Sequence, residues 1–231
     1  YSVFVLKPLT AAIQYSFYRW NGITVATFVG SANYVRVLTD PQLLSGIAHA
    51  FFLIIFFTVL PVAGGLLMAA LLREIRAKAF GTVARTVLFL PQIIPGAAAA
   101  IAWVWMFSSS GTANQVLSAV GLGGIARAWL GDFTWSLPAV GLIGTWINLG
   151  FCMILLLSGI GKIDASIYEA ARLDGAGFGR TLASVTLPGL KQELGVCITV
   201  TIISALASFD IIFMSTQGGP GYATMVPGVL V

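Results

Sequence analysis

The sequence predicts an all-α protein that crosses a membrane several times. Of its 231 residues, 58% are hydrophobic and only 9% are charged, whereas a soluble domain carries about 25% charged residues. Several apolar runs reach the roughly 20 residues that a helix needs to cross a bilayer. The polar and charged residues gather in the stretches between those runs. This composition favours a bundle of helices surrounded by lipid.

Six apolar stretches are the expected spans of one transmembrane domain that covers residues 1–231. They are residues 1–20, 47–72, 86–107, 135–160, 194–216 and, as the opening of a sixth, 224–231. The chain begins without methionine inside one apolar segment and stops inside another, so the first and sixth helices are expected to be incomplete. The first span ends in an aromatic belt typical of a membrane surface, made of Tyr15, Phe17, Tyr18 and Trp20.

The stretches between the spans differ: residues 21–46 are polar and turn-rich and are expected to form a loop, whereas the loop 73–85 is short and basic. The third span carries Pro91 and Pro95, which free backbone carbonyls and are tolerated only beside protein or a water-filled cavity. The glycine-rich loop 108–134 is expected to hold a short surface helix near 114–120. Residues 217–221 predict a tight turn.

The basic residues orient the chain, because loops that face the cytoplasm carry an excess of Lys and Arg. Loop 73–85 and the polar segment 161–192 hold eight basic residues, against three in the other loops. The eight are Arg73, Arg76, Lys78, Arg85, Lys162, Arg172, Arg180 and Lys191. The polar segment and the amino terminus are therefore expected to lie in the cytoplasm.

The polar segment 161–192 predicts a small helical hairpin. Ser166 and Glu169 form the pattern of a capping box, in which the serine accepts from the Glu169 amide and the carboxylate reaches back. Gly175 and Gly177 are expected to close that helix, because glycine adopts left-handed conformations without strain. A second helical stretch should then run from residue 178 until Pro188, since proline disfavours helix in the residue before it.

The spacing within this segment resembles the EAA loop of ABC-importer permeases. Glu169-Ala170-Ala171 is followed after three residues by Gly175, after nine more by Val185, and then by Leu187-Pro188. Val185 replaces the isoleucine of the family pattern. The alternative is an ordinary capped helix at the membrane surface. By resemblance, the residues that couple to an ATPase are Ser166, Glu169, Ala170, Ala171, Asp174, Gly175, Ala176, Leu187 and Pro188.

Further matches occur in the family's order along most of the chain and resemble its carbohydrate branch. They are Phe28-Val29-Gly30, Asn33-Tyr34, Arg85-Thr86, Leu88-Phe89-Leu90-Pro91, Trp103, Gly111, Asn114, Leu117, Trp146, Phe209-Asp210, Thr216, Gly218-Gly219-Pro220 and Thr224. The resemblance implies a six-helix permease fold in the inner or plasma membrane of a bacterium or archaeon. It also implies several partners: a homologous second permease subunit, two ATPase subunits that bind ATP and Mg, and an extracytoplasmic solute-binding protein.

The residues themselves predict no covalent chemistry, no bound metal and no nucleic-acid surface. The segment around Lys162 lacks the first glycine and the following Ser or Thr of a phosphate-binding loop, so ATP is not expected to bind to this chain. His49 is the single histidine and stands at the start of an apolar run, where packing is the simpler role. Cys152 and Cys197 fall inside apolar runs and are expected to pack as small hydrophobic side chains.

Seven residues are candidates to line a substrate path. They are Trp146, Asn148, Asp210, Ser204, Ser208, Trp103 and Lys7. A polar side chain within a span must find a partner or face water, so the alternative for Asn148, Asp210 and the serines is a contact between helices. The alternative for Trp103 is the aromatic belt. Lys7 could reach the membrane surface or favour an anionic substrate.

The sequence leaves three hypotheses for the function. The first is the permease subunit of an ABC importer for a carbohydrate, such as an oligosaccharide, with a glycerol phosphate ester as the anionic variant. The second is an ion-driven secondary transporter, which would need paired ionisable groups within the membrane. The third is a membrane scaffold without a water-filled path. Within the first, Glu169 is expected to contribute to coupling as well as to capping.

Overall fold

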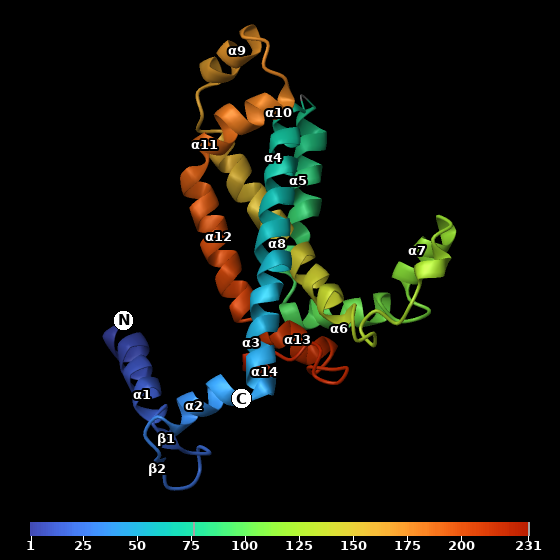
Figure 1. Ribbon diagram of the computed structural model, residues 1–231. Helices are drawn as coiled ribbons and strands as arrows, with labels where there is room; N and C mark the ends of the chain where they lie inside the picture. The colour runs from blue at the N-terminus through green and yellow to red at the C-terminus, as the bar shows by residue number, and fades with distance from the viewer. Residues whose placement is uncertain (76, 231) are drawn as a thin grey trace.

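A 34-residue helix and a 25-residue helix pack side by side at the centre of the fold (Figure 1). The first comprises α3 (Pro41–Ile54), the π-helical turn η2 (Ile55–Val59) and α4 (Leu60–Glu74). The second is α8 (Ser136–Ile160). The computed structural model describes residues 1–75 and 77–230. Arg76 and Val231, which belong to the predicted basic loop and sixth span, lie outside the described residues.

Two further helical pairs complete the bundle, and both are bent. The chain bends by 101° between α5 (Lys78–Ile93) and α6 (Gly96–Met106). It bends by 78° between the helix Phe178–Gly189 and α12 (Lys191–Leu206). The helix Phe178–Gly189 comprises α10 (Phe178–Thr181), η4 (Leu182–Thr186) and α11 (Leu187–Gly189). In the described part of the chain, two helices alone can cross a membrane by length and composition, or four if each bent pair counts as one.

The structure corrects three of the expected spans. The stretch 86–107 is interrupted at Ile94 and Pro95, because α6 can begin after Pro95 but cannot continue straight from α5 through it. The stretch 194–216 ends as α12 at Leu206, and α13 (Phe209–Ser215) follows as a separate helix. At the amino terminus, η1 (Ser2–Leu6) and α1 (Lys7–Tyr15) end before the aromatic belt does.

The remaining short elements lie at the periphery (Figure 1). Strands β1 (Tyr18–Arg19) and β2 (Thr27–Phe28) pair in antiparallel fashion and carry Tyr18 of the predicted belt. Helix α2 (Ala32–Thr39) leads into α3, and α7 (Thr112–Ala119) lies near its predicted position, followed by η3 (Gly123–Ile125). The helix α14 (Pro227–Leu230) begins within the predicted sixth span.

Each of three prolines inside a helix follows a π-helical turn. The turns η1, η2 and η4 each end two residues before a proline, namely Pro8, Pro61 and Pro188. A proline ring clashes with the carbonyl four residues before it and has no N–H to donate. Widening the preceding turn relieves both problems. The helix that begins at Phe178 ends at Gly189, one residue beyond the predicted Pro188.

Close contacts at glycines bring α8 against its neighbours. A Cβ at Gly150 would collide with the Leu88 carbonyl and lie 2.7 Å from Phe89 Cα, so α5 and α8 touch backbone to backbone. Gly144 lies against the ring of Phe57, and Gly65 on α4 faces Cys152 of α8. Both cysteines are buried and free, as expected. Small residues allow this close approach between membrane helices, whose association draws on packing contacts.

Replacing Gly150 with Ala should therefore destabilise the protein. The added methyl group has no room between α8 and α5, and overpacking of this kind costs about 1–3 kcal/mol. Thermal unfolding in detergent measures the effect. Gly195→Ala on α12 is the matched control, because nothing lies within 4 Å of a Cβ there. Equal stability of the two variants would contradict the close contact.

Candidate functional site

The polar segment folds into a helical hairpin at one end of the bundle (Figure 1). Helix α9 (Ala165–Leu173) begins after Asp164, whose carboxylate accepts from the Ser166 amide at 2.9 Å. Asp164 is therefore the N-cap, and Ser166 lies in the first turn. The predicted capping box of Ser166 and Glu169 is wrong, because an aspartate two residues earlier takes the same role equally well.

Of the two glycines that were predicted to end α9, one does so. Gly175 has a φ of +73° and follows the C-cap Asp174. The amides of Gly175 and Ala176 donate to the carbonyls of Arg172 and Ala171, which is the Schellman arrangement. Gly177 is extended and instead precedes α10 as its N-cap.

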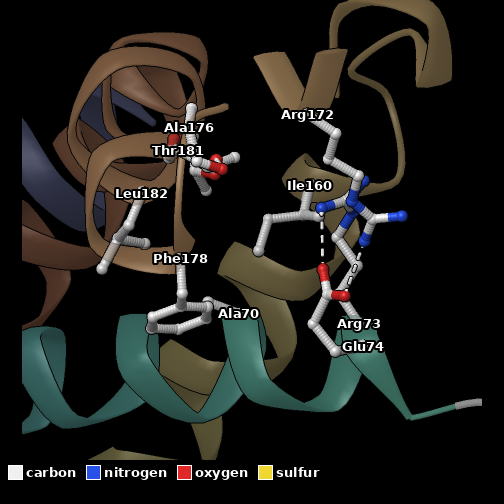
Figure 2. Close-up of a pocket in the computed structure, with 10 residues that line it drawn as sticks. Ala70, Arg73, Glu74, Ile160, Arg172, Ala176, Phe178, Thr181 and Leu182 are labelled. Carbon is white, nitrogen blue, oxygen red and sulfur yellow. Dashed lines mark hydrogen bonds and ion pairs between the residues drawn. The ribbon is translucent and has the colours of Figure 1, made fainter. Parts of the chain in front are cut away.

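Side-chain contacts attach the hairpin to the bundle (Figure 2). Arg172 of α9 reaches Glu74 at the end of α4, with 2.7 Å between Nη2 and Oε2. The Arg73 guanidinium lies 3.2 Å from the centre of the Tyr168 ring. The buried Tyr168 hydroxyl is 3.2 Å from that of Thr186. The exposed ion pair adds little stability in water, so the buried tyrosine and its stacked arginine set the position of α9.

A second ion pair holds the base of the hairpin. Lys162, directly after α8, donates to Glu193 in the first turn of α12 at 2.8 Å. The lysine thus has a structural partner. Together with the contacts of α9, this pair connects the hairpin to α4, α8 and α12.

The outer face of the hairpin exposes apolar side chains among charged ones, and the rest of the described chain does not cover it. Leu173 is 89% exposed and Ile167 is 49% exposed. A groove of about 460 Å³ runs between α9 and the following helix, lined in part by Ala170, Ala171, Asp174 and Ala176. Glu169 is exposed, and within residues 1–75 and 77–230 its side chain takes part in no hydrogen bond or ion pair. This face offers small side chains, one exposed leucine and a free carboxylate.

A partly polar cavity of about 310 Å³ lies where α5, α6, α8, α12 and α13 meet, and it is open to the surface, since Asp210 and Ala207 in its lining are exposed. Four of the seven predicted path residues line it, namely Asn148, Ser204, Ser208 and Asp210. Asn148 donates to the Gly144 carbonyl one turn earlier, at 2.9 Å, and Ser208 donates to Ala205. Both bonds lie within one helix or at its end. The expected hydrogen bonds between helices are not what fixes these two side chains.

Asp210 lies where the third span is broken. A Cβ at Gly96 would collide with the Asp210 carboxylate. That carboxylate therefore sits beside the first turn of α6 and also in the first turn of its own helix, α13. Anionic side chains are stabilised near the amino termini of helices by the exposed N–H groups. This placement explains a carboxylate in an apolar stretch without an ion pair among the described residues.

The other predicted path residues lie outside this cavity. Trp103 and Trp146 contact each other edge to face, with ring centres 5.6 Å apart, and pack against the hydrophobic core. Lys7 is exposed on α1, which extends away from the bundle (Figure 1). His49 contacts the Met225 carbonyl at 2.9 Å, a structural role.

Sequence reasoning missed Gln92 in this cavity. Its Oε1 atom is buried without a hydrogen-bond partner in the described part of the chain. Gln92 stands between two prolines of the third span. A polar residue next to Pro91 in an apolar stretch was the available signal.

A bundle of helices long and apolar enough to cross a membrane, with a polar cavity and an exposed hairpin at one end, is typical of a transport subunit. The family model described as "Binding-protein-dependent transport system inner membrane component" matches residues 62–228. The chain belongs to this family, and it is an ABC permease of the inner membrane. Its relatives are permease proteins, so it is a transport component and not an enzyme.

Three curated relatives cover almost the whole chain. The probable ABC transporter permease protein YurN of Bacillus subtilis (strain 168) is 32% identical over 97% of this chain and 77% of YurN. The lactose transport system permease protein LacF of Rhizobium radiobacter is 32% identical over 97% and 75% of the two chains. The trehalose/maltose transport system permease protein MalF of Thermococcus litoralis (strain ATCC 51850 / DSM 5473 / JCM 8560 / NS-C) is 34% identical over 96% and 75%.

A solved structure shares the fold. A chain of a bacterial ABC transporter involved in the import of the acidic polysaccharide alginate superposes with a TM-score of 0.79 at 24% identity, covering 99% of this chain and 77% of that one. This match confirms the predicted permease fold.

Replacing Asp164 with Ala should loosen the start of α9. The pKa of Asp164 lies below its usual value of 3.8 because the Ser166 amide donates to the carboxylate. The cap is therefore complete above pH 3.8 and is lost as the pH falls through the lowered pKa. Amide hydrogen exchange should be faster in the first turn of Asp164→Ala at pH 7 but near wild type in Ser166→Ala. The opposite order would restore Ser166 as the cap.

Proposed function

We propose that this chain is the permease subunit of an importer for a neutral carbohydrate. The relatives named for lactose and for trehalose/maltose transport support a sugar of two or more units. The observation that carries the proposal is the polar cavity, which gathers amides, hydroxyls and a carboxylate between otherwise apolar helices. These groups form the hydrogen bonds that sugar hydroxyls require.

The outer face of the α9–α10 hairpin is proposed to bind an ATPase subunit in the cytoplasm. An 89% exposed leucine and a groove lined by alanines suit the close approach of another protein. Glu169 has no capping role, so its carboxylate is free to contact that partner. The proposed assembly contains a homologous second permease, two ATPase subunits that hold ATP and Mg, and an extracytoplasmic solute-binding protein. One structural relative is part of a complex with an alginate pentasaccharide-bound periplasmic protein.

The mechanism is a change between two states, driven by the ATPase subunits. Movements at α9 reach the bundle through Arg172–Glu74 and Tyr168–Arg73 on α4 and through Lys162–Glu193 on α12. Helix α8 ends directly before the hairpin and carries Asn148 in its middle. A displacement of the hairpin would therefore be transmitted to the cavity along rigid helices. An amino terminus in the cytoplasm accompanies this orientation.

The anionic and ion-driven alternatives receive less support. Lys7 lies on a helix that extends away from the cavity, and its side chain is exposed. Among the described residues, Lys7 and Asp210 take part in no ion pair with each other. A coupled pair of ionisable groups at mid-membrane, typical of secondary transporters, is thus missing from the described part of the chain.

Leu173→Glu should prevent the ATPase subunit from co-purifying with the permease, because a charge replaces the exposed apolar contact at the tip of α9. Val25→Glu is the matched control, since Val25 is 88% exposed in the loop between β1 and β2.

In the assembled transporter, Glu169→Gln should lower substrate-stimulated ATP hydrolysis about as much as Glu169→Ala. Activity retained by Gln and lost by Ala would show that the charge is not needed.

Gln92→Leu should lower the rate of oligosaccharide uptake at low concentration about fivefold. It removes an amide that can bond a sugar hydroxyl, and a net hydrogen bond is worth about 1 kcal/mol. Uptake of radiolabelled maltose and lactose in cells that express the complete transporter measures the effect. Gln14→Leu, at an exposed position of α1, is the matched control. Lys7→Met should not change the preference of the transporter for a neutral sugar over its phosphate ester, because Lys7 is exposed away from the cavity. Equal uptake by Gln92→Leu and Gln14→Leu would remove Gln92 from the path.

A further inference from the structure

A second cavity lies among α4, α5 and α8, at the end of the bundle that carries the hairpin. Its volume is about 520 Å³. Leu72, Ile154 and Leu157 contribute apolar walls, and two basic residues, Arg73 and Arg85, also line the cavity. No role in the transport cycle proposed above uses this cavity.

The charge in this cavity is positive. No carboxylate is among the described residues that line it. The nearby Glu74 is shared between Arg172 at 2.7 Å and Arg73 at 3.3 Å, so it does not neutralise both. Arg85 is exposed and takes part in no ion pair within residues 1–75 and 77–230. The two guanidinium charges outweigh the partial negative charge at the end of α8.

The Ser158 hydroxyl adds a polar group on the same wall. It lies on the exposed side of α8, lines the cavity and makes no hydrogen bond within the described chain. Guanidinium groups bind phosphate oxygens in a bidentate manner, and a hydroxyl can complete such a site. The polar part of the cavity therefore suits a phosphate group.

We propose that this cavity binds an anionic phospholipid, with the phosphate at Arg85 and Arg73 and an acyl chain along Leu72, Ile154 and Leu157. Basic pockets between membrane helices on the cytoplasmic side bind anionic lipid headgroups. The apolar walls distinguish a lipid from free phosphate, which would leave them exposed to water. Assignment to the cytoplasmic leaflet rests on the proposed function, whereas binding itself does not.

The lipid would also contact residues that attach the hairpin to the bundle. Arg73 lines the cavity and stacks on Tyr168 of α9. Its neighbour in the chain, Glu74, pairs with Arg172 (Figure 2). A phosphate that draws on the same guanidinium would change how firmly α4 holds the hairpin.

The test measures lipid binding to the full chain, purified with the subunits that accompany it and stripped of native lipid in a neutral detergent. Native mass spectrometry gives the affinity for dioleoyl phosphatidylglycerol and for dioleoyl phosphatidylcholine. The expected result is at least fivefold tighter binding of phosphatidylglycerol. Arg85→Gln should weaken that binding about fivefold, the contribution of one basic residue near an anionic membrane surface. Arg85→Lys should weaken it less.

Lys191→Gln is the control, because it removes one exposed positive charge near the same end of the bundle and outside this cavity. It should weaken binding less than twofold. Equal affinities for the two lipids, equal effects of Arg85→Gln and Lys191→Gln, or full competition by inorganic phosphate would each overturn the proposal. So would displacement of the lipid by an acidic segment of a partner subunit. The lipid affinity is measured without ATP hydrolysis, so the result can be interpreted even if the proposed transport function is wrong.

Discussion

The close contact of α8 with α4 and α5 is the constraint on which the rest of the structure depends. Gly150 allows the α5 backbone to touch α8, and Gly65 does the same for α4. Lipid tails are as apolar as leucine, so burial alone does not hold membrane helices together, and close packing must do so. With three helices fixed in this way, α8 becomes a rigid rod between the cavity and the hairpin.

The breaks in the other helices follow from the same arrangement. Helix α6 turns away from α5 at Pro95, and α13 turns away from α12 after Leu206. These turns bring the first turn of α6 next to Asp210, and the polar cavity forms where they meet. Irregular backbone at membrane depth is tolerated where it is buried in protein or lines a cavity. The polar groups that sugar import requires therefore occur where the helices are interrupted.

The hairpin and the bundle depend on different kinds of interaction. Within the hairpin, local hydrogen bonds at Asp164 and Gly175 define where α9 begins and ends. Between hairpin and bundle, a buried tyrosine and a few ion pairs provide the connection. Local structure can thus stay intact while the connection is altered, which suits the proposed role of the hairpin as the contact with an ATPase subunit.

The sequence by itself determined the membrane-embedded helical fold, the hairpin and its relation to ABC permeases, because composition, spacing and glycine positions are local properties. It placed Gly175 correctly but assigned the cap to Ser166, since Asp164 and Ser166 are both good caps and only the path of the chain chooses between them. It grouped Asn148, Ser204, Ser208 and Asp210 as candidates for a substrate path, and these four line one cavity. It missed Gln92 in that cavity, and it could not foresee that Trp103 and Trp146 pack against the core. Those distinctions rest on the angles between helices, which packing at glycines and prolines decides across residues far apart in the chain.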